Sequence, residues 1–363
     1  MKKKRFLLPV LCLLIPLALM VSALAAGGDL SDPLASLSYL TGIFTDTVDK
    51  RVDEKLNASD QALLSGNLEA VSGSSTATWT ETRLKEGDVL TGSTGTSVLV
   101  LAGGARVTFS GAVVDVTTGT AVTSGSALAV NHRYLVAENT TADFTVTSKT
   151  AVVDYQGPYA FRYSNATDYN AIAAALKTLN LFKGSFTGYG EGYDLEVAPT
   201  RLQALIMFIR VLGEEDAALA YTGPMPFTDV AAGSQSEKYV GYAYSKGYTN
   251  GYSATTFRPS QTVTAGQYME FMLRALGYSS AANTDLSGTL DNAYANGVIT
   301  SGELTALQSG TFLRADLVYV SYYALDATMT GTGITLRDTL MNKGTFTSAQ
   351  VSAAAALVPG ARK

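Results

Sequence analysis

Apolar residues follow the same helical pattern three times in the second half of this 363-residue chain. The three blocks span residues 201–213, 265–277 and 314–326. Within the blocks, apolar side chains return every three or four positions, which is the spacing of one face of an α-helix. A leucine stands at the same step of every block: Leu212, Leu276 and Leu325. One supersecondary unit is therefore predicted to occur three times.

A glycine precedes each block at a nearly constant distance. Gly184, Gly247 and Gly297 stand 17, 18 and 17 residues before the first residue of their blocks. Each unit is thus predicted to be a helix, a glycine-rich loop and a second helix. Such a pair of helices cannot bury its apolar stripe alone, so the units are expected to pack on one another. The predicted fold of residues 165–326 is an all-α bundle of three units.

Residues 77–163 have the pattern of short strands. Val, Thr and aromatic residues alternate in runs such as 97–101, 106–109 and 134–137, and Gly or Asn punctuates them. Many short strands at regular spacing predict a small antiparallel β-sandwich or roll. The acidic residues of this region are scattered, so no carboxylate pair for glycoside hydrolysis is defined.

The first 25 residues have the features of a secretory signal peptide. Lys2 to Arg5 supply positive charge, residues 6–21 are apolar, and Ala23-Leu24-Ala25 is an A-x-A cleavage site. Cleavage would leave no membrane span, whereas the alternative is an uncleaved membrane anchor. We therefore expect a secreted protein.

Residues 28–70 are predicted to form an amphipathic helix. Leu34, Leu37 and Leu40 begin an apolar stripe that continues at helical spacing to Leu56. Such a stripe needs a partner. Two alternatives stay open: the helix packs on the following β region, or it self-associates as a short coiled coil.

The composition limits the kinds of site and partner that the chain can have. Cys12 is the only cysteine and lies in the predicted signal, and His132 is the only histidine. The mature chain is therefore expected to lack disulfides and metal sites, because a zinc site needs more nitrogen and sulfur ligands. Loss of the four signal cations takes the formal charge from −5 to −9, which disfavours nucleic-acid binding. His132 is predicted to lie in a turn or at a strand edge, and we expect no catalytic residue or cofactor.

The middle unit resembles an S-layer homology (SLH) repeat. Its motifs are Phe227-Thr-Asp-Val230, an aromatic-bearing helix ending at Gly247, Thr256-Phe-Arg-Pro259 and a helix that begins after Thr264. The first and third units resemble the same repeat at the start of their second helices. The first unit carries Pro199-Thr-Arg201 there, and the third carries Leu313-Arg-Ala-Asp316. The resemblance gives three SLH-like units at residues 168–213, 227–277 and 286–326. Residues 327–363 are then a tail, helical near 335–342, that is expected to cover the final unit or to fray.

The candidate site residues follow from the starts of the second helices. Thr200 and Thr264 stand where an N-cap is expected. Arg201 and Arg314 occupy the first helical turn, where the helix dipole disfavours a cation. The resemblance implies that these arginines line grooves for secondary cell-wall polysaccharide, which often carries acidic groups. The middle unit has Ala265 at this position.

Two further residues of the middle unit are candidates. Asp229 opens this unit and is predicted to cap its first helix rather than to contact ligand. Tyr239 stands where the SLH pattern commonly has tryptophan, and it could stack on a sugar ring.

The function predicted from the sequence is non-catalytic anchoring of an exported protein. The partner would be secondary cell-wall polysaccharide or another peptidoglycan-linked polymer. The alternative is an extracellular hydrolase, or a glycan-binding adhesin, whose site lies in the β region and which the repeats anchor.

Overall fold

The computed structural model describes residues 46–48, 50–52, 54, 74–184, 188–280, 282–283, 285–358 and 362–363. The chain divides into two compact parts, residues 1–69 and 70–363. The predicted signal peptide at 1–25 lies outside the described residues, as does most of the predicted helix at 28–70. The described residues between 46 and 54 are helical. Within the described part, no helix is both long enough and apolar enough to cross a membrane.

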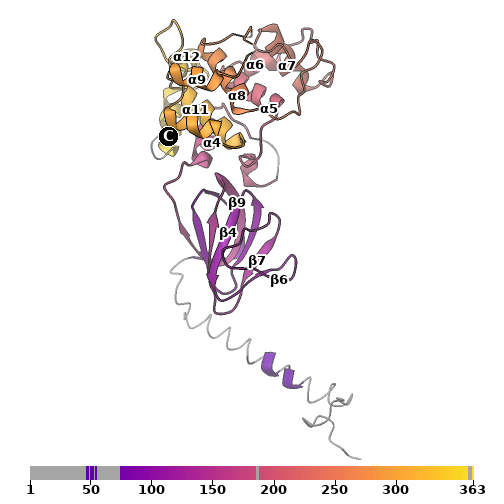
Figure 1. Ribbon diagram of the computed structural model, residues 1–363, viewed down its shortest axis with the longest axis vertical. Helices are drawn as coiled ribbons and strands as arrows, with labels where there is room; N and C mark the ends of the chain where they lie inside the picture. Colours follow the sequence, from indigo (N-terminus) through magenta and orange to yellow (C-terminus); the bar gives the residue numbers. More distant parts are fainter. Residues whose placement is uncertain are drawn as a thin grey trace, which may run out of the picture. The chain divides into compact units, whose positions relative to one another are not determined.

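In the described part of the chain, nine strands form one antiparallel sheet, which Figure 1 shows. The strands are β1 (Ser75–Lys85), β2 (Val89–Gly92), β3 (Ser97–Ala102), β4 (Ala105–Ser110), β5 (Val113–Asp115), β6 (Thr120–Ala121), β7 (Arg133–Val136), β8 (Thr141–Val146) and β9 (Thr150–Arg162). Their order is β4-β8-β2-β9-β3-β7-β5-β6, and β1 also pairs with β9. The sheet curls into a half-barrel, so the predicted antiparallel β region is confirmed. Of the two predicted forms, a roll describes the sheet better than a sandwich of two sheets.

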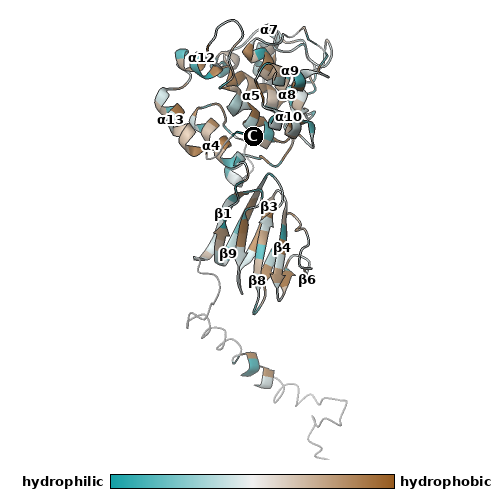
Figure 2. Cartoon of the chain, turned by 60° about the vertical axis from the view of Figure 1, so that its left-hand side comes forward, coloured by the Kyte–Doolittle hydropathy of each residue, from teal (hydrophilic) through white to brown (hydrophobic). Residues whose placement is uncertain are grey.

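Strand β9 makes the curl. Its first half pairs with β3 as far as Gln156, and its second half pairs with β2 from Tyr159 onward. Gly157 lies between the two halves with φ +98°, where a Cβ would come within 3.0 Å of the Gly95 carbonyl oxygen. Glycine is therefore required at the bend. Inward side chains such as Val100, Val107 and Phe144 fill the core, and Figure 2 shows hydrophobic and polar residues interleaved along the strands.

The remaining described chain is helical. The helices are α4 (Tyr169–Thr178), α5 (Arg201–Val211), α6 (Glu215–Leu219), α7 (Gln235–Ser245), α8 (Ala265–Leu276), α9 (Thr289–Ala295), α10 (Ser301–Gln308), α11 (Arg314–Ala324), α12 (Leu336–Asn342) and α13 (Ser348–Leu357), with a 3₁₀ turn η2 (Gly190–Gly192). The three apolar blocks of the sequence are α5, α8 and α11, so these helices are confirmed. The helix predicted near 335–342 is α12.

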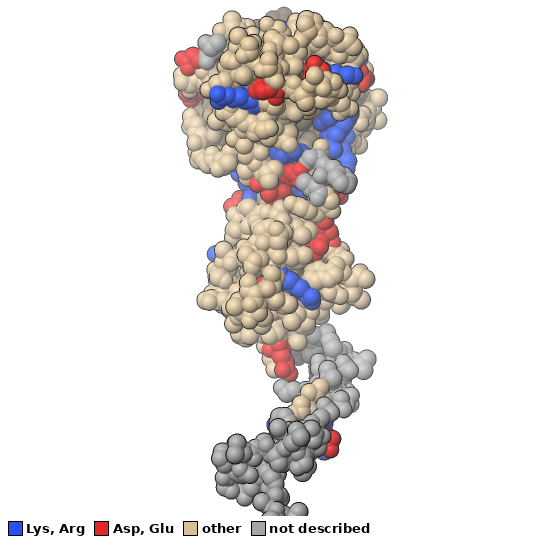
Figure 3. Space-filling view, turned by 90° about the vertical axis from the view of Figure 1, so that its right-hand side faces the viewer, with Lys and Arg blue, Asp and Glu red and all other residues tan. Residues whose placement is uncertain are grey.

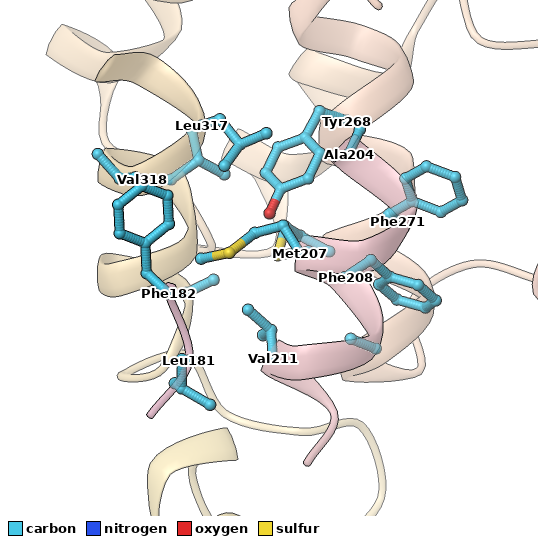
Figure 4. Packing of buried hydrophobic residues seen from close by; sticks show 14 of the residues in the cluster. Leu181, Phe182, Ala204, Met207, Phe208, Val211, Tyr268, Phe271, Leu317 and Val318 are labelled. Atoms are coloured by element: carbon cyan, nitrogen blue, oxygen red, sulfur yellow. The ribbon is translucent and has the colours of Figure 1, made fainter. Parts of the chain in front are cut away.

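Helices α5, α8 and α11 contact one another in the centre of the helical region. Figure 4 shows Phe208 of α5, Tyr268 of α8 and Leu317 of α11 in one apolar cluster. The rings of Phe208 and Phe271 lie 4.9 Å apart, and the hydroxyls of Tyr268 and Ser321 are 2.6 Å apart. Full burial of a large apolar side chain such as Phe208 contributes about 1.5–3 kcal/mol to the free energy of folding. The three predicted blocks therefore share a single core.

The first helix of each predicted unit packs on the central helix of another unit. Helix α7 packs on α5, α9 packs on α8, and α4 packs on α11. The helical region is consequently interlocked in a ring rather than stacked as independent pairs. The tail continues this ring, because α13 packs on α4 and the Gln350 side chain donates to the Thr178 carbonyl at 3.1 Å. The tail thus covers the first helix of the first unit, in addition to following the final unit.

Candidate functional site

The glycine before each central helix has a left-handed backbone. Gly184, Gly247 and Gly297 have φ values of +72°, +70° and +69°. L-residues with a side chain rarely adopt this conformation, whereas glycine does so readily. The glycine before each central helix therefore forms a left-handed turn, within the loop that the sequence predicts for each unit.

Two cavities lie between the predicted units, and the same helical positions line both. The Arg314 groove, of about 140 Å³, is lined by Phe182, Gly184, Pro199, Gln203, Ile206, Met207, Arg210, Arg314 and Leu317. The Arg201 groove, of about 320 Å³, is lined by Arg201, Thr249, Asn250, Gly251, Tyr252, Val263, Gln267, Glu270, Phe271, Arg274, Asn283 and Leu286. In the aligned blocks, residues 199, 203, 206, 207 and 210 correspond to 263, 267, 270, 271 and 274. The grooves are therefore two copies of one site.

Each groove receives an arginine from the start of a different central helix. Arg314 begins α11 and reaches the groove along α5, while Arg201 begins α5 and reaches the groove along α8. Both sites thus depend on the interlocked arrangement. The corresponding residue of α8 is Ala265, as the sequence indicated.

Arg201 is held by the loop that precedes α8. Its backbone N–H donates to the Gln261 carbonyl at 2.7 Å, and its Nε donates to the Phe257 carbonyl at 2.9 Å. The guanidinium lies 5.0 Å from the centroid of the Phe257 ring. Burial and nearby Arg258 lower the pKa of Arg201, while Asp229 opposes this shift. Among the described residues, Arg201 forms no ion pair.

Arg314 is buried, with 5 % of the residue exposed. Its backbone N–H donates to the Val197 carbonyl at 2.9 Å, and its guanidinium lies 5.8 Å from the centroid of the Phe182 ring. Burial lowers the pKa of Arg314, while the charges of Asp194 and Glu196 raise it. No carboxylate of the described chain forms an ion pair with this guanidinium. A desolvated cation of this kind favours an anionic ligand.

The second arginine of each groove is already paired. Arg274 donates from Nε to Glu270 at 3.1 Å and from Nη1 to the Tyr248 carbonyl at 2.8 Å. Arg210 donates from Nε to Glu215 at 2.8 Å. These arginines support the groove walls. Sequence reasoning missed both, although they stand at the same step of the first two apolar blocks.

The predicted caps are present. Thr200 accepts a hydrogen bond from the Gln203 backbone N–H, and Thr264 accepts one from Gln267. In both cases the glutamine side chain returns a hydrogen bond to the threonine N–H, which completes a capping box. The threonines therefore fix where Arg201 and its counterpart Ala265 lie.

Two predictions for the middle unit are wrong. Ser234, not Asp229, caps α7. The Asp229 carboxylate instead accepts from the backbone N–H groups of Phe257 and Arg258 at 2.8 and 2.7 Å. Tyr239 is only 4 % exposed and donates its hydroxyl to Glu215 at 2.6 Å, so its ring offers no face for a sugar. Burial and Glu215 raise the pKa of Tyr239 to about 12.

In the β region, the histidine lies beside an aspartate near a turn. His132 precedes β7, as predicted, and its Nδ1 lies 2.7 Å from Asp115. No group of three His, Cys, Asp or Glu residues in the described ranges has the geometry to hold a metal ion. Charged side chains cover a minor part of the face in Figure 3, in agreement with 16 % charged residues in the chain.

The described helices thus pack as an interlocked ring, in which two central helices each present an arginine to a groove on a neighbouring central helix. Residues 226–269 match the family described as the S-layer homology domain, and the chain is thus an SLH-domain-containing protein. The match runs from the Phe227 motif into α8 and covers most of the predicted middle unit. Comparison with curated proteins gave no match. SLH domains bind cell-wall polymers, which indicates an association with the cell surface.

Proposed function

We propose that this protein is exported and anchors itself to the cell wall by binding secondary cell-wall polysaccharide. The proposal rests on one observation, the pair of equivalent grooves that each hold an arginine without an ion pair. The polymer would place an acidic group against Arg201 in one groove and against Arg314 in the other. Anchoring needs no catalysis, and we assign no catalytic residue or cofactor.

The chemistry of the arginines supports an acidic ligand. A guanidinium presents a rigid fork of donors that matches a carboxylate or phosphate bidentately. In each groove the other arginine has a carboxylate partner and this one does not. An incoming anion therefore meets a partly desolvated cation before binding, and in Arg201 the Phe257 carbonyl also orients the guanidinium. Such pre-organisation lowers the cost of association.

The proposal includes three SLH-like units of unequal function. The groove that α8 would complete has Ala265 in place of arginine, so we assign two anion-binding grooves to the ring. Because both arginines reach into grooves on other helices, neither groove can form in an isolated unit.

The β region is then the part that the anchor holds at the cell surface. The N-terminal helix is a candidate for self-association.

The test is co-sedimentation of the full chain with purified sacculi that carry their secondary polymer. We expect Arg201→Ala and Arg314→Ala each to weaken binding about 10- to 100-fold, because a charge-assisted hydrogen bond contributes about 1.5–3 kcal/mol. Arg201→Lys should recover only part of the loss, since lysine keeps the charge but not the fork.

The matched control is Arg106→Ala, which removes an exposed arginine from β4 in the β region. It should bind like wild type. Equal sedimentation with sacculi stripped of secondary polymer would contradict the proposal. Unchanged binding of the Arg201→Ala, Arg314→Ala double variant, with thermal unfolding showing an intact fold, would also contradict it.

A further inference from the structure

The third predicted unit lacks an arginine that the other two share. Arg210 of α5 and Arg274 of α8 stand at the same step, and α11 has Tyr323 there. In the Arg201 groove this arginine has a defined task, because it joins the buried Glu270 to the loop after α7. Tyr323 cannot donate the same set of hydrogen bonds, since a phenol carries one donor and a guanidinium carries five.

Arg362 supplies the missing guanidinium from elsewhere in the chain. Its Nε and Nη2 donate to the two carboxylate oxygens of Glu303 at 2.6 and 2.8 Å. Nη2 also donates to the Val298 carbonyl at 2.6 Å. The guanidinium lies 5.1 Å from the centroid of the Tyr323 ring, within cation–π distance of the side chain that replaced the helix arginine.

The contacts of Arg362 repeat those of Arg274. Arg274 donates to the carbonyl of Tyr248, the residue after left-handed Gly247. Arg362 donates to the carbonyl of Val298, the residue after left-handed Gly297. Each arginine also pairs with a glutamate that is 2 % exposed, Glu270 in one case and Glu303 in the other. The two guanidiniums therefore occupy equivalent places in two units.

Lys363 fastens the same segment to its surroundings. Its backbone N–H donates to the Tyr319 hydroxyl at 3.0 Å, and its carbonyl accepts from the Thr300 hydroxyl at 2.6 Å. Tyr319 corresponds to Ile206 and Glu270, which line the two open grooves. Residues 362 and 363 thus cover the wall that would form the third groove.

We propose that the third groove is an alkylguanidinium-binding site that the chain fills with its own Arg362. Arg362 acts as a latch, because it joins residues 362–363 to α10 and α11, while α13 packs on α4. The latch closes the helical ring at the unit whose own helix lacks the arginine. Because Arg362 fills the third groove, only the Arg201 and Arg314 grooves remain open to the polymer. This last consequence rests on the proposed function, whereas the latch does not.

The geometry explains why a guanidinium is selected. Glu303 is buried, and a buried carboxylate without a cation is strongly destabilising. Glu303 also accepts from the Tyr319 hydroxyl at 2.9 Å, which leaves both oxygens oriented toward Arg362. A fork is needed to reach the carboxylate and the Val298 carbonyl together, and an ammonium cannot span both in this geometry.

Chemical rescue tests the site directly. We expect Arg362→Ala to lower the melting temperature of the full chain by roughly 5–10 °C, because it leaves Glu303 buried without a cation. Millimolar methylguanidinium should restore part of this loss in Arg362→Ala. It should not raise the melting temperature of wild type, whose site is filled, or of the Glu303→Gln, Arg362→Ala double variant, whose site has lost its charge. Equal responses in all three proteins would overturn the proposal.

A second measurement uses a milder variant. In wild type, NMR should show an arginine Nε–H that exchanges slowly with solvent and that disappears in Arg362→Lys. Exchange of the Arg362 Nε–H at the rate of free arginine would overturn the latch. Sacculus binding separates the two proposals, because Arg362→Lys should bind sacculi like wild type even where Arg201→Ala does not.

Discussion

At the scale of single residues, Asp229 illustrates how a side chain can act through backbone contacts. Desolvation raises the pKa of this exposed carboxylate, but hydrogen bonds from the Phe257 and Arg258 N–H groups prevail and hold the pKa below the usual 3.8. These bonds position the Phe257 carbonyl, which in turn accepts from Arg201. Asp229 therefore supports the wall of the Arg201 groove through the loop that holds Arg201.

We predict that Asp229→Asn destabilises the protein by about 1 kcal/mol at pH 7, because a charged acceptor is replaced by a neutral amide. A group whose pKa is lowered by folding contributes stability above its unfolded pKa, and that stability is lost as pH falls through the folded pKa. The difference between wild type and variant should thus shrink below about pH 4. Urea unfolding at pH 7 and pH 3 measures it, and a difference that is constant with pH would contradict this role.

The sequence could place the two arginines at the starts of α5 and α11, but it could not show the surroundings of the tyrosine and the aspartate. Arg201 and Arg314 stand out because a cation in the first turn opposes the helix dipole. Tyr239 and Asp229 were misassigned because their partners, Glu215 and the 257–258 backbone, are distant in sequence. Whether an aromatic ring is buried depends on such long-range packing, which local patterns do not contain.

At the scale of elements, two glycines of one loop have different requirements. Gly247 and Gly251 have φ values of +70° and +79°, so both suit glycine. A Cβ on Gly247 would meet nothing within 4 Å, whereas a Cβ on Gly251 would collide with the Phe227 ring and the Ser253 carbonyl. Glycine is therefore favoured at position 247 only by the backbone conformation. At position 251 it is favoured also because a side chain would collide with its neighbours.

We predict that Gly247→Ala costs about 1–2 kcal/mol, the penalty of a left-handed residue with a side chain. Gly251→Ala should cost clearly more, because Phe227 must move from its buried position. It should also weaken sacculus binding, since Gly251 lines the Arg201 groove. Denaturant midpoints of the two variants compare them, with Gly247→Ala as the matched control. Equal destabilisation would show that the contact with Phe227 is unimportant.

Element identity was largely predictable where the signal is local. Threonine caps and turn glycines depend on the residues next to them, so Thr200, Thr264 and Gly247 could be assigned correctly. Helix α10 was not foreseen, although Thr300 and Glu303 form a capping box at its start. The third unit has this helix where the middle unit has its Phe257 loop, and no periodic apolar stripe marked it.

At the scale of the whole molecule, the connectivity of the ring lies beyond sequence patterns. Each block predicts a helix with one apolar face, but the block does not specify which neighbour covers that face. The observed pairing of α4 with α11 joins the first predicted unit to the third, and Arg362 closes the ring over a gap in the pattern of the repeats. Both features depend on long-range contacts whose free energy is realised only when the complete ring forms.

A shared core predicts that the helical region unfolds cooperatively. Phe208 is fully buried between α5 and α8, while Val100 is fully buried in the separate core of the β region. Phe208→Ala should cost about 3–5 kcal/mol and Val100→Ala about 2–3 kcal/mol, as large-to-small core substitutions do. The single tryptophan, Trp79, lies in β1 and reports on the β region, while circular dichroism at 222 nm reports on the helices.

Phe208→Ala should therefore lower the midpoint of the helical signal and abolish sacculus binding through both grooves, because α5 carries one groove and supplies Arg201 to the other. Val100→Ala should lower the midpoint of the Trp79 signal first. Salt bridges such as Arg83–Glu196 at 2.6 Å and Lys149–Asp316 at 2.6 Å join the two regions, so each variant should also shift the other signal by a smaller amount. Combining Phe208→Ala with Arg314→Ala separates the contributions of the two grooves to sacculus binding. If Phe208→Ala impaired only one groove, the units would bind independently, and the complete ring would not be required for function.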